Sequence, residues 1–173
     1  MNKKKVAIVG TVGLPANYGG WETLVDNLTI HLQDRFDITV FCSFKKYNKK
    51  LKEFNGAKLK YINLNANGIQ SILYDCISIY QSLKFADTIL VLGVSGCICL
   101  PLVRFFGISR IIVNIDGVEW KRDKWNKFTK LFLKISERFA VKFAHFLITD
   151  NEGIQNYVFE RYAVKSHLIS YGG

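Results

Sequence analysis

The chain has 173 residues, of which 49% are hydrophobic, 22% are charged and only two are prolines. These values indicate one globular domain with a sizeable core and exclude a low-complexity chain. Lysine and arginine outnumber the acidic residues by 24 to 14, which gives a formal net charge of +10. Such a surface favours anionic partners, namely nucleic acid, acidic lipid headgroups or phosphorylated substrates.

Nothing at the N-terminus indicates a secretory signal, because residues 2–5 lead straight into a short strand-like run. The longest apolar stretch, residues 88–103, is broken by glycines and a proline and is too short to cross a bilayer comfortably. We expect a strand, a turn and a short helix there. The four cysteines lie in apolar segments without zinc or redox spacing and are expected to be buried thiols of a cytosolic protein.

The first expected strand, residues 5–10, runs into the glycine-rich segment TVGLPANYGG, and a helical pattern starts at Trp21. Glycine permits positive φ and lets another group approach the backbone closely. The free N–H groups at the start of a helix favour an anion. A tight strand-to-helix turn that needs glycine for steric reasons alone is the alternative, and the residues by themselves leave both open.

Further along the chain, strand-like runs alternate with helical patterns. Several runs are almost continuously apolar, as expected for parallel strands covered on both faces. The alternation predicts a doubly wound, mostly parallel, Rossmann-like α/β sheet. The expected strands are 38–42, 58–64, 88–92, 110–115, 145–149 and, weakly, 167–170; the apolar helix stripes are Trp21, Leu24, Leu28 and Leu32, then Ile72, Cys76, Ile79 and Leu83, then Phe128, Phe132, Ile135, Phe139 and Phe143; and a last helix starts at Asp150-Asn-Glu.

Two regions are strongly basic. Lysines crowd residues 45–52, where the interspersed Tyr47 and Asn48 indicate an exposed, mobile loop. The helix expected at residues 124–144 carries a cationic stripe, which is either an ordinary solvated face or a surface that lies on an anionic membrane. The stripe consists of Lys127, Lys130, Lys134, Arg138 and Lys142, and Trp125 and Leu131 lie near its border.

Ligands of open α/β sheets bind beyond the carboxyl ends of the strands, so the residues directly after each strand are the candidates for a site. The segment from Gly10 to Gly13 lacks the GxGxxG spacing, and no acidic residue ends the second strand, which argues against a nicotinamide dinucleotide site. No phosphate-loop lysine follows the glycines, and the three histidines form no triad with a nucleophile. No metal site is predicted.

The segment NIDGVEWKRDKW after the fifth expected strand is the most unusual. Its carboxylates suit hydrogen bonds with sugar hydroxyls, its indoles suit stacking on sugar C–H faces, and its cations suit a phosphate. The alternative is a helix N-terminus with acids near its positive end and tryptophans in packing roles. The residues concerned are Asp116, Glu119, Trp120, Lys121, Arg122, Asp123 and Trp125.

Taken together, these segments resemble the N-terminal domain of bacterial GT-B glycosyltransferases of family 4, in the rhamnosyltransferase-like (DUF1972-type) branch. The likeness covers the whole chain and lies in three ordered motifs. The matching residues are Gly10, Thr11, Gly13, Pro15, Ala16, Tyr18, Gly19, Gly20, Glu22 and Thr23; then Asp116, Gly117, Glu119, Trp120, Lys121, Arg122 and Trp125; then Asp150, Asn151, Gly153 and Ile154.

The resemblance implies an enzyme that transfers a sugar to a lipid-linked saccharide in cell-surface polysaccharide synthesis, and L-rhamnose from dTDP-rhamnose is the sugar that it suggests. It would be peripheral at the cytoplasmic face of the membrane and would use a nucleotide-diphosphate sugar and no cofactor. Residues 1–173 would form the acceptor-side domain, would lack the C-terminal donor-binding domain, and would be inactive without that domain or a partner chain. A non-catalytic α/β module that binds a phosphate-bearing ligand or an anionic membrane is the alternative, and nucleic-acid binding is disfavoured.

By the same resemblance, Asp116 and Glu119 are the expected catalytic residues, with Asp116 orienting the reacting sugar or acceptor hydroxyl and Glu119 supporting it. Backbone N–H groups of Gly19 and Gly20 would face the leaving diphosphate. The expected substrate- and phosphate-binding residues are Gly13, Tyr18, Gly19, Gly20, Glu22, Trp120, Lys121, Arg122, Asp150 and Asn151.

Overall fold

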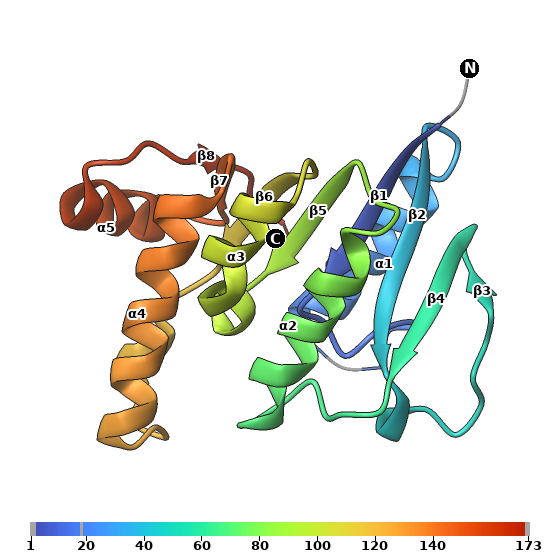
Figure 1. Cartoon of the computed structure of the whole chain (residues 1–173), viewed down its shortest axis with the longest axis horizontal. Coiled ribbons are helices and arrows are strands. Elements are labelled where there is room, and N and C mark those ends of the chain that lie inside the picture. The colour runs from blue at the N-terminus through green and yellow to red at the C-terminus, as the bar shows by residue number, and fades with distance from the viewer. Residues whose placement is uncertain (1–2, 18, 172–173) are drawn as a thin grey trace.

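A computed structural model describes residues 3–17 and 19–171 and contains one eight-stranded sheet flanked by helices (Figure 1). The strand order is β3-β4-β2-β1-β5-β6-β7-β8, and every pair is parallel except β3 with β4. The strands are β1 (Lys4–Val9), β2 (Phe36–Ser43), β3 (Glu53–Phe54), β4 (Ala57–Ile62), β5 (Thr88–Leu92), β6 (Arg110–Ile115), β7 (Phe146–Thr149) and β8 (His167–Leu168); the helices are α1 (Gly20–Leu32), α2 (Gln70–Ser82), α3 (Leu100–Phe106), α4 (Lys127–Phe143) and α5 (Glu152–Tyr162).

From β1 the chain first builds one side of the sheet with β2, β3 and β4, and then the other side with β5 to β8. Strand β1 therefore pairs with β2 on one side and with β5 on the other. This is the topological switch point, where the connections that leave the carboxyl ends of two neighbouring strands run to opposite faces of the sheet and leave a crevice between them. The predicted doubly wound, mostly parallel arrangement is therefore confirmed.

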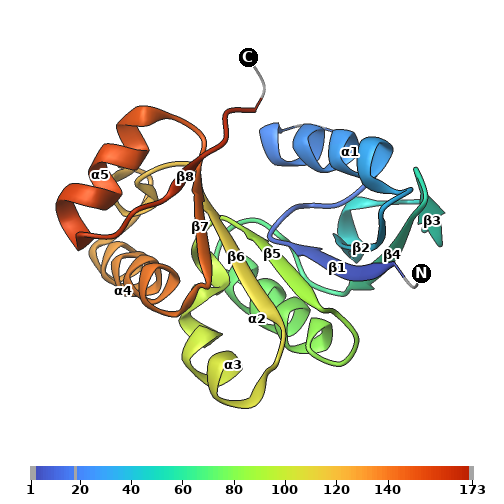
Figure 2. The ribbon, with the colours of Figure 1, turned by 90° about the horizontal axis from the view of Figure 1, so that it is seen from above.

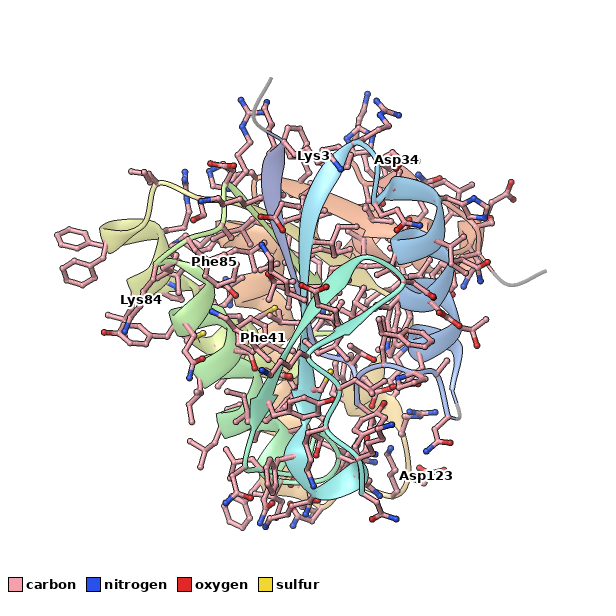
Figure 3. All side chains as sticks on the ribbon, turned by 90° about the vertical axis from the view of Figure 1, so that its right-hand side faces the viewer. Lys3, Asp34, Phe41, Lys84, Phe85 and Asp123 are labelled. Carbon is pink, nitrogen blue, oxygen red and sulfur yellow. The ribbon has the colours of Figure 1, made fainter. Side chains whose placement is uncertain are left out.

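Helices cover the two faces of the sheet unequally (Figure 2). Alternate residues of β1 define the two cores: Ala7 and Val9 belong to the larger one, with α2 to α5, whereas Ile8 belongs to the smaller one, with α1. Phe41 of β2 is fully buried in the larger core, and Phe85, which follows α2, packs against this core (Figure 3). Because both faces are covered, the central strands contain long apolar runs.

Most of the expected elements are present, with changes at their ends. Strand β2 begins two residues earlier than predicted, β8 contains only His167 and Leu168, and the two-residue β3 was missed. Helix α4 begins at Lys127 rather than near residue 124. The side chain of Asn126 explains that start, because its Oδ1 atom accepts a hydrogen bond of 2.9 Å from the N–H of Thr129 and caps the helix.

The apolar stripe predicted for α4 is partly wrong. Phe128 is 86% exposed and Ile135 is 40% exposed. The buried residues of α4 are instead Leu133, Ser136, Glu137 and Ala140, so two polar side chains lie inside while aromatic and aliphatic ones lie outside.

The basic loop after β2 is also better anchored than predicted. Tyr47 is buried, and its hydroxyl donates a hydrogen bond of 3.0 Å to the carbonyl oxygen of Pro15. The expectation of an exposed loop is therefore wrong at Tyr47, which ties this connection to the glycine-rich segment.

The remaining sequence predictions concern the cysteines and the membrane. All four cysteines are free, Cys42 and Cys97 are buried, and Cys76 and Cys99 are half-buried. Among the described residues, no helix is both long and apolar enough to cross a membrane.

Candidate functional site

A cleft of about 730 Å³ lies at the carboxyl ends of the strands, at the switch point between β1 and β5. Its walls come from the residues after β1, β5 and β6 and from the N-terminal ends of α1, α2 and α4. This volume falls within the range of small-molecule sites. The lining residues that matter below are Gly10, Gly19, Gly20, Ile69, Asp75, Ser95, Asp116, Glu119, Arg122, Trp125 and Phe128.

Gly10 lines the cleft directly after β1, at a position where no larger residue fits. Its φ angle is +90°, and an added Cβ atom would overlap the carbonyl oxygen of Leu92 on β5. The two strand ends therefore approach each other closely at the base of the cleft.

Gly13 has a different role from the predicted contact with substrate. It is buried, has a φ angle of +125°, and a Cβ atom there would lie 2.6 Å from the Cβ of Cys42. Gly13 packs against β2 and does not line the cleft.

Glu22 holds the glycine-rich loop in place. Its side chain is buried, and Oε1 accepts hydrogen bonds from the hydroxyl of Thr11 at 3.0 Å and from the N–H of Val12 at 2.9 Å. Glu22 does not line the cleft, whereas Gly19 and Gly20 do. Gly20 is the first residue of α1, which starts without a side-chain cap from the described residues. Tyr18 lies outside the described residues.

Asp116 follows β6 on the floor of the cleft. Ile115 is paired with Thr149, so Asp116 and Asp150 follow adjacent strand ends. Burial, followed by the nearby carboxylate of Glu119, raises the pKa of Asp116 to about 6. Asp116 can therefore exchange a proton close to neutral pH.

Glu119 and Arg122 form an ion pair of 2.7 Å at the edge of the cleft, across the short turn of residues 119–121. The Arg122 side chain is 58% exposed, which leaves the guanidinium accessible to an anion. These two residues and Asp116 bring two carboxylates and a cation together in one cleft.

Trp120 and Lys121 face away from the cleft. The indole N–H of Trp120 lies 3.1 Å from the hydroxyl oxygen of Tyr157 and 3.4 Å from Oε1 of Glu137. The ammonium of Lys121 lies 5.7 Å from the centre of the Trp120 ring. Neither residue lines the cleft. Trp120 packs between the turn, α4 and α5, whereas Lys121 is exposed.

Asp150 and Asn151 mark the start of α5. Asn151 Oδ1 accepts a hydrogen bond of 2.9 Å from the N–H of Ile154, and its amide donates one of 2.8 Å to Asp150 Oδ1. Asn151 is thus a helix cap, as the sequence pattern indicated. Both residues are next to Asp116 at the strand ends, outside the set that lines the cleft.

The cationic residues of α4 lie mainly on its outer side. Lys127, Lys134, Arg138 and Lys142 are exposed. Lys130 is half-buried, and its ammonium lies 3.8 Å from a carboxylate oxygen of Asp123.

Sequence reasoning missed Asp75, a carboxylate in the cleft wall. It is 3% exposed, its Oδ2 accepts a hydrogen bond from the hydroxyl of Ser95, and its Oδ1 has no partner among the described residues. Burial raises the pKa of Asp75 to about 7. The indole N–H of Trp125, also in the lining, is buried and has no partner in the part of the chain that the structure describes. The wall of the cleft thus contains one buried acceptor and one buried donor whose hydrogen-bonding capacity the described residues leave unused.

Sequence reasoning also missed Glu137, which is fully buried between α4 and α5. Its Oε1 accepts hydrogen bonds of 2.6 Å from Tyr157 and 2.5 Å from Tyr162, and Arg161 lies 3.9 Å away. This cluster holds Trp120 in place and so supports the turn that carries Glu119. No group of three or more metal-binding side chains is found in the described part of the chain.

The fold and the cleft define a class of protein, the Rossmann-like α/β domains with a cleft at the switch point of a parallel sheet. Solved structures with this fold include a sucrose-phosphate synthase from Thermosynechococcus elongatus (TM-score 0.62, 10% identity, 98% of this chain and 90% of that one). They also include Anabaena HepE in complex with UDP and glucose (TM-score 0.59, 15% identity, 99% of this chain and 45% of that one). A third is a UDP-N-acetylglucosamine 2-epimerase from Rickettsia bellii (TM-score 0.51, 15% identity, 91% of this chain and 41% of that one).

These likenesses confirm the predicted fold class, a doubly wound, mostly parallel, Rossmann-like α/β sheet. The chain spans less than half of the HepE and epimerase chains. A search of curated protein sequences gave no match. The sequence model of the DUF1972 family, described as a domain of unknown function, matches residues 3–173, and the chain therefore belongs to the DUF1972 family.

Proposed function

We propose that this chain is the acceptor-side domain of a glycosyltransferase and that the cleft at the switch point is where the sugar is transferred. One observation carries the proposal: Gly19 and Gly20 at the start of α1 and Asp116 after β6 line the same cleft. A helix N-terminus favours the developing charge of a leaving diphosphate, and a carboxylate accepts hydrogen bonds from sugar hydroxyls.

The other cleft residues are compatible with this assignment. Arg122 is exposed beside Glu119 and can meet a phosphate, while Asp75 Oδ1 and the indole N–H of Trp125 can meet hydroxyl groups. Asp116 orients the reacting sugar or the acceptor hydroxyl, and Glu119 keeps Arg122 in position. The carboxyl of Asp116, with its pKa near 6, accepts a hydrogen bond from that hydroxyl once it is ionised.

The donor would be a nucleotide-diphosphate sugar, with dTDP-rhamnose as the specific candidate, and the acceptor a lipid-linked saccharide. The three solved structures reported above carry names or ligands that concern sugars: a sucrose-phosphate synthase, HepE with UDP and glucose, and a UDP-N-acetylglucosamine 2-epimerase. The rhamnosyl choice rests on the resemblance of the three sequence motifs. The enzyme would work at the cytoplasmic face of the membrane, held by cations of α4 such as Lys127 and Lys142.

The test uses the natural full-length protein, a panel of nucleotide sugars and a lipid-linked acceptor. We expect transfer from one donor and a loss of about 100-fold or more in kcat for Asp116→Asn, because the contact with the reacting group is lost. The melting temperature of this variant should stay within a few degrees of the wild type.

Two results would count against the proposal. Absence of transfer with every donor would refute an enzymatic role, and a variant that loses folding and turnover equally would assign Asp116 to structure. If a nucleotide or phosphate binds in the cleft without any transfer, the non-catalytic binding module becomes the better description.

A further inference from the structure

Helix α2 exposes an apolar stripe on the side opposite the core. Ile69, Leu73, Ile77 and Tyr80 follow one another at intervals of four, four and three residues and therefore share one face of the helix. They are 75%, 60%, 37% and 63% exposed. An outer helix of an α/β domain normally turns polar residues to water, so this helix is apolar on both sides.

Helix α3 continues this surface. Leu102, Phe105 and Phe106 are 67%, 81% and 75% exposed, and Ile108 directly after the helix is fully exposed. Gly107 lies against the side chain of Leu83 at the end of α2, so the ends of the two helices are in contact. Figure 2 places α2 and α3 side by side on the same face of the sheet.

Helix α4 brings the surface to the mouth of the cleft. Phe128 and Leu131 are 86% and 58% exposed. Phe128 also belongs to the lining of the cleft, as does Ile69 at the start of α2. Two exposed apolar side chains thus flank the cleft at the N-terminal ends of α2 and α4, and these helix ends lie at the lower side of Figure 1.

The outward surfaces of α2, α3 and α4 are called the outer face here, together with Ile69 and Ile108. Eleven of the seventeen large hydrophobic side chains exposed among the described residues lie on it, so the concentration is far from even. An apolar surface of this extent marks an interaction site.

Charge decides which partner fits. The only acidic residues of these three helices are Asp75 and Glu137, and both are buried. Exposed cations border the apolar residues, among them Arg104 and Lys142. Lys84, at the end of α2, is on this side of the molecule, whereas the exposed Asp34 and Asp123 lie toward the opposite side (Figure 3).

We propose that the outer face docks on an anionic lipid bilayer, with Phe105, Phe106 and the α2 stripe inserted among the lipids and the cations at the headgroups. Apolar side chains bordered by cations, on three helices without an exposed acidic residue, match this layer structure. The surface docks the protein independently of the reaction. As a consequence that rests on the proposed function, docking places the opening between Ile69 and Phe128 beside the bilayer, where a lipid-linked acceptor enters.

Binding of the natural full-length protein to vesicles tests the docking. Vesicles of phosphatidylglycerol and phosphatidylcholine should bind it, vesicles of phosphatidylcholine alone should bind it weakly, and added salt should reduce the binding. The double variant Phe105→Ser/Phe106→Ser should bind about tenfold or more weakly, because two phenyl groups lose their burial. The matched control Ile30→Ser/Phe159→Ser removes exposed apolar side chains from α1 and α5 and should bind like the wild type.

Three outcomes would overturn the docking proposal. The first is unchanged vesicle binding by the Phe105→Ser/Phe106→Ser variant. The second is vesicle binding that depends neither on salt nor on anionic lipid. The third is that the wild type binds no vesicles but self-associates in solution, and that the variant loses this self-association. The last outcome would make the outer face an interface between copies of the chain.

A comparison of acceptors separates this proposal from the proposed function. The double variant should transfer sugar to a water-soluble acceptor at the wild-type rate and to an acceptor in vesicles about tenfold or more slowly. Equal rates on both acceptors would refute the orientation of the cleft toward the bilayer. If neither protein transfers any sugar while the vesicle results hold, the proposed function fails and the docking surface stands.

Discussion

Replacing Asp75 by asparagine should stabilise the protein, and more so at alkaline pH. Asp75 is 3% exposed, one of its oxygens has no partner among the described residues, and its pKa rises from 3.8 to about 7 on folding. Such a rise corresponds to about 4 kcal/mol. Below pH 3.8 the carboxyl is protonated in both states and costs nothing. Between pH 3.8 and 7 only the folded protein keeps the proton, so stability falls as the pH rises, and above pH 7 the full cost remains.

Asparagine has the same shape and cannot ionise, so Asp75→Asn removes this cost. Urea unfolding should show a gain in the free energy of unfolding over the wild type that is about 3 kcal/mol larger at pH 8 than at pH 5. Other titrating groups cancel in that comparison. Ser95→Ala, which removes the hydrogen bond that favours the ionised carboxyl, should instead destabilise more at pH 8 than at pH 5. An Asp75→Asn effect that is equal at the two pH values would refute the reasoning.

Two further predictions concern stability and are measured by thermal or urea denaturation. Glu137→Ala should lower the free energy of unfolding by about 3–5 kcal/mol, because its tyrosine and tryptophan donors lose their buried acceptor. The control Arg138→Ala, at the neighbouring exposed residue, should change the free energy of unfolding by less than about 0.5 kcal/mol. Gly10→Ala should cost about 2 kcal/mol or more through its positive φ and the overlap with β5, and Gly20→Ala, with open space around it, less than about 1 kcal/mol. Equal losses within either pair would contradict the packing described.

The sheet could be predicted from the sequence because its central strands are buried on both faces. Runs such as TILVL in β5 and RIIVNI in β6 then differ from everything around them. Helix α4 was predicted less well for the opposite reason. Periodicity assigns apolar residues to the inside, but Phe128 is exposed and Glu137 is buried, because α5 supplies tyrosine hydroxyls to the carboxylate.

The same distinction applies to the cleft. Asp116 and the glycines could be located because they directly follow strands, and the carboxyl ends of parallel strands share one edge. Asp75 and Ser95 lie twenty residues apart, one inside a helix and one after β5, so their contact depends on how α2 packs against the turn after that strand. Gly96 permits this approach because glycine has no Cβ atom, and a Cβ at this position would overlap the side chain of Asp75. Sequence spacing carries no signal of such a contact.

Helix α2 connects the two proposals of function, because it contributes to the cleft and to the outer face at once. Asp75 points into the wall of the cleft, while Leu73 and Ile77, two residues away on either side, are exposed to solvent. In a rigid helix of thirteen residues these directions are fixed relative to each other. A bilayer that takes up Leu73 and Ile77 therefore also sets the orientation of the Asp75 carboxyl and of the cleft opening beside Ile69. Access to an acceptor anchored in lipid then follows from the docking geometry without a separate recognition element.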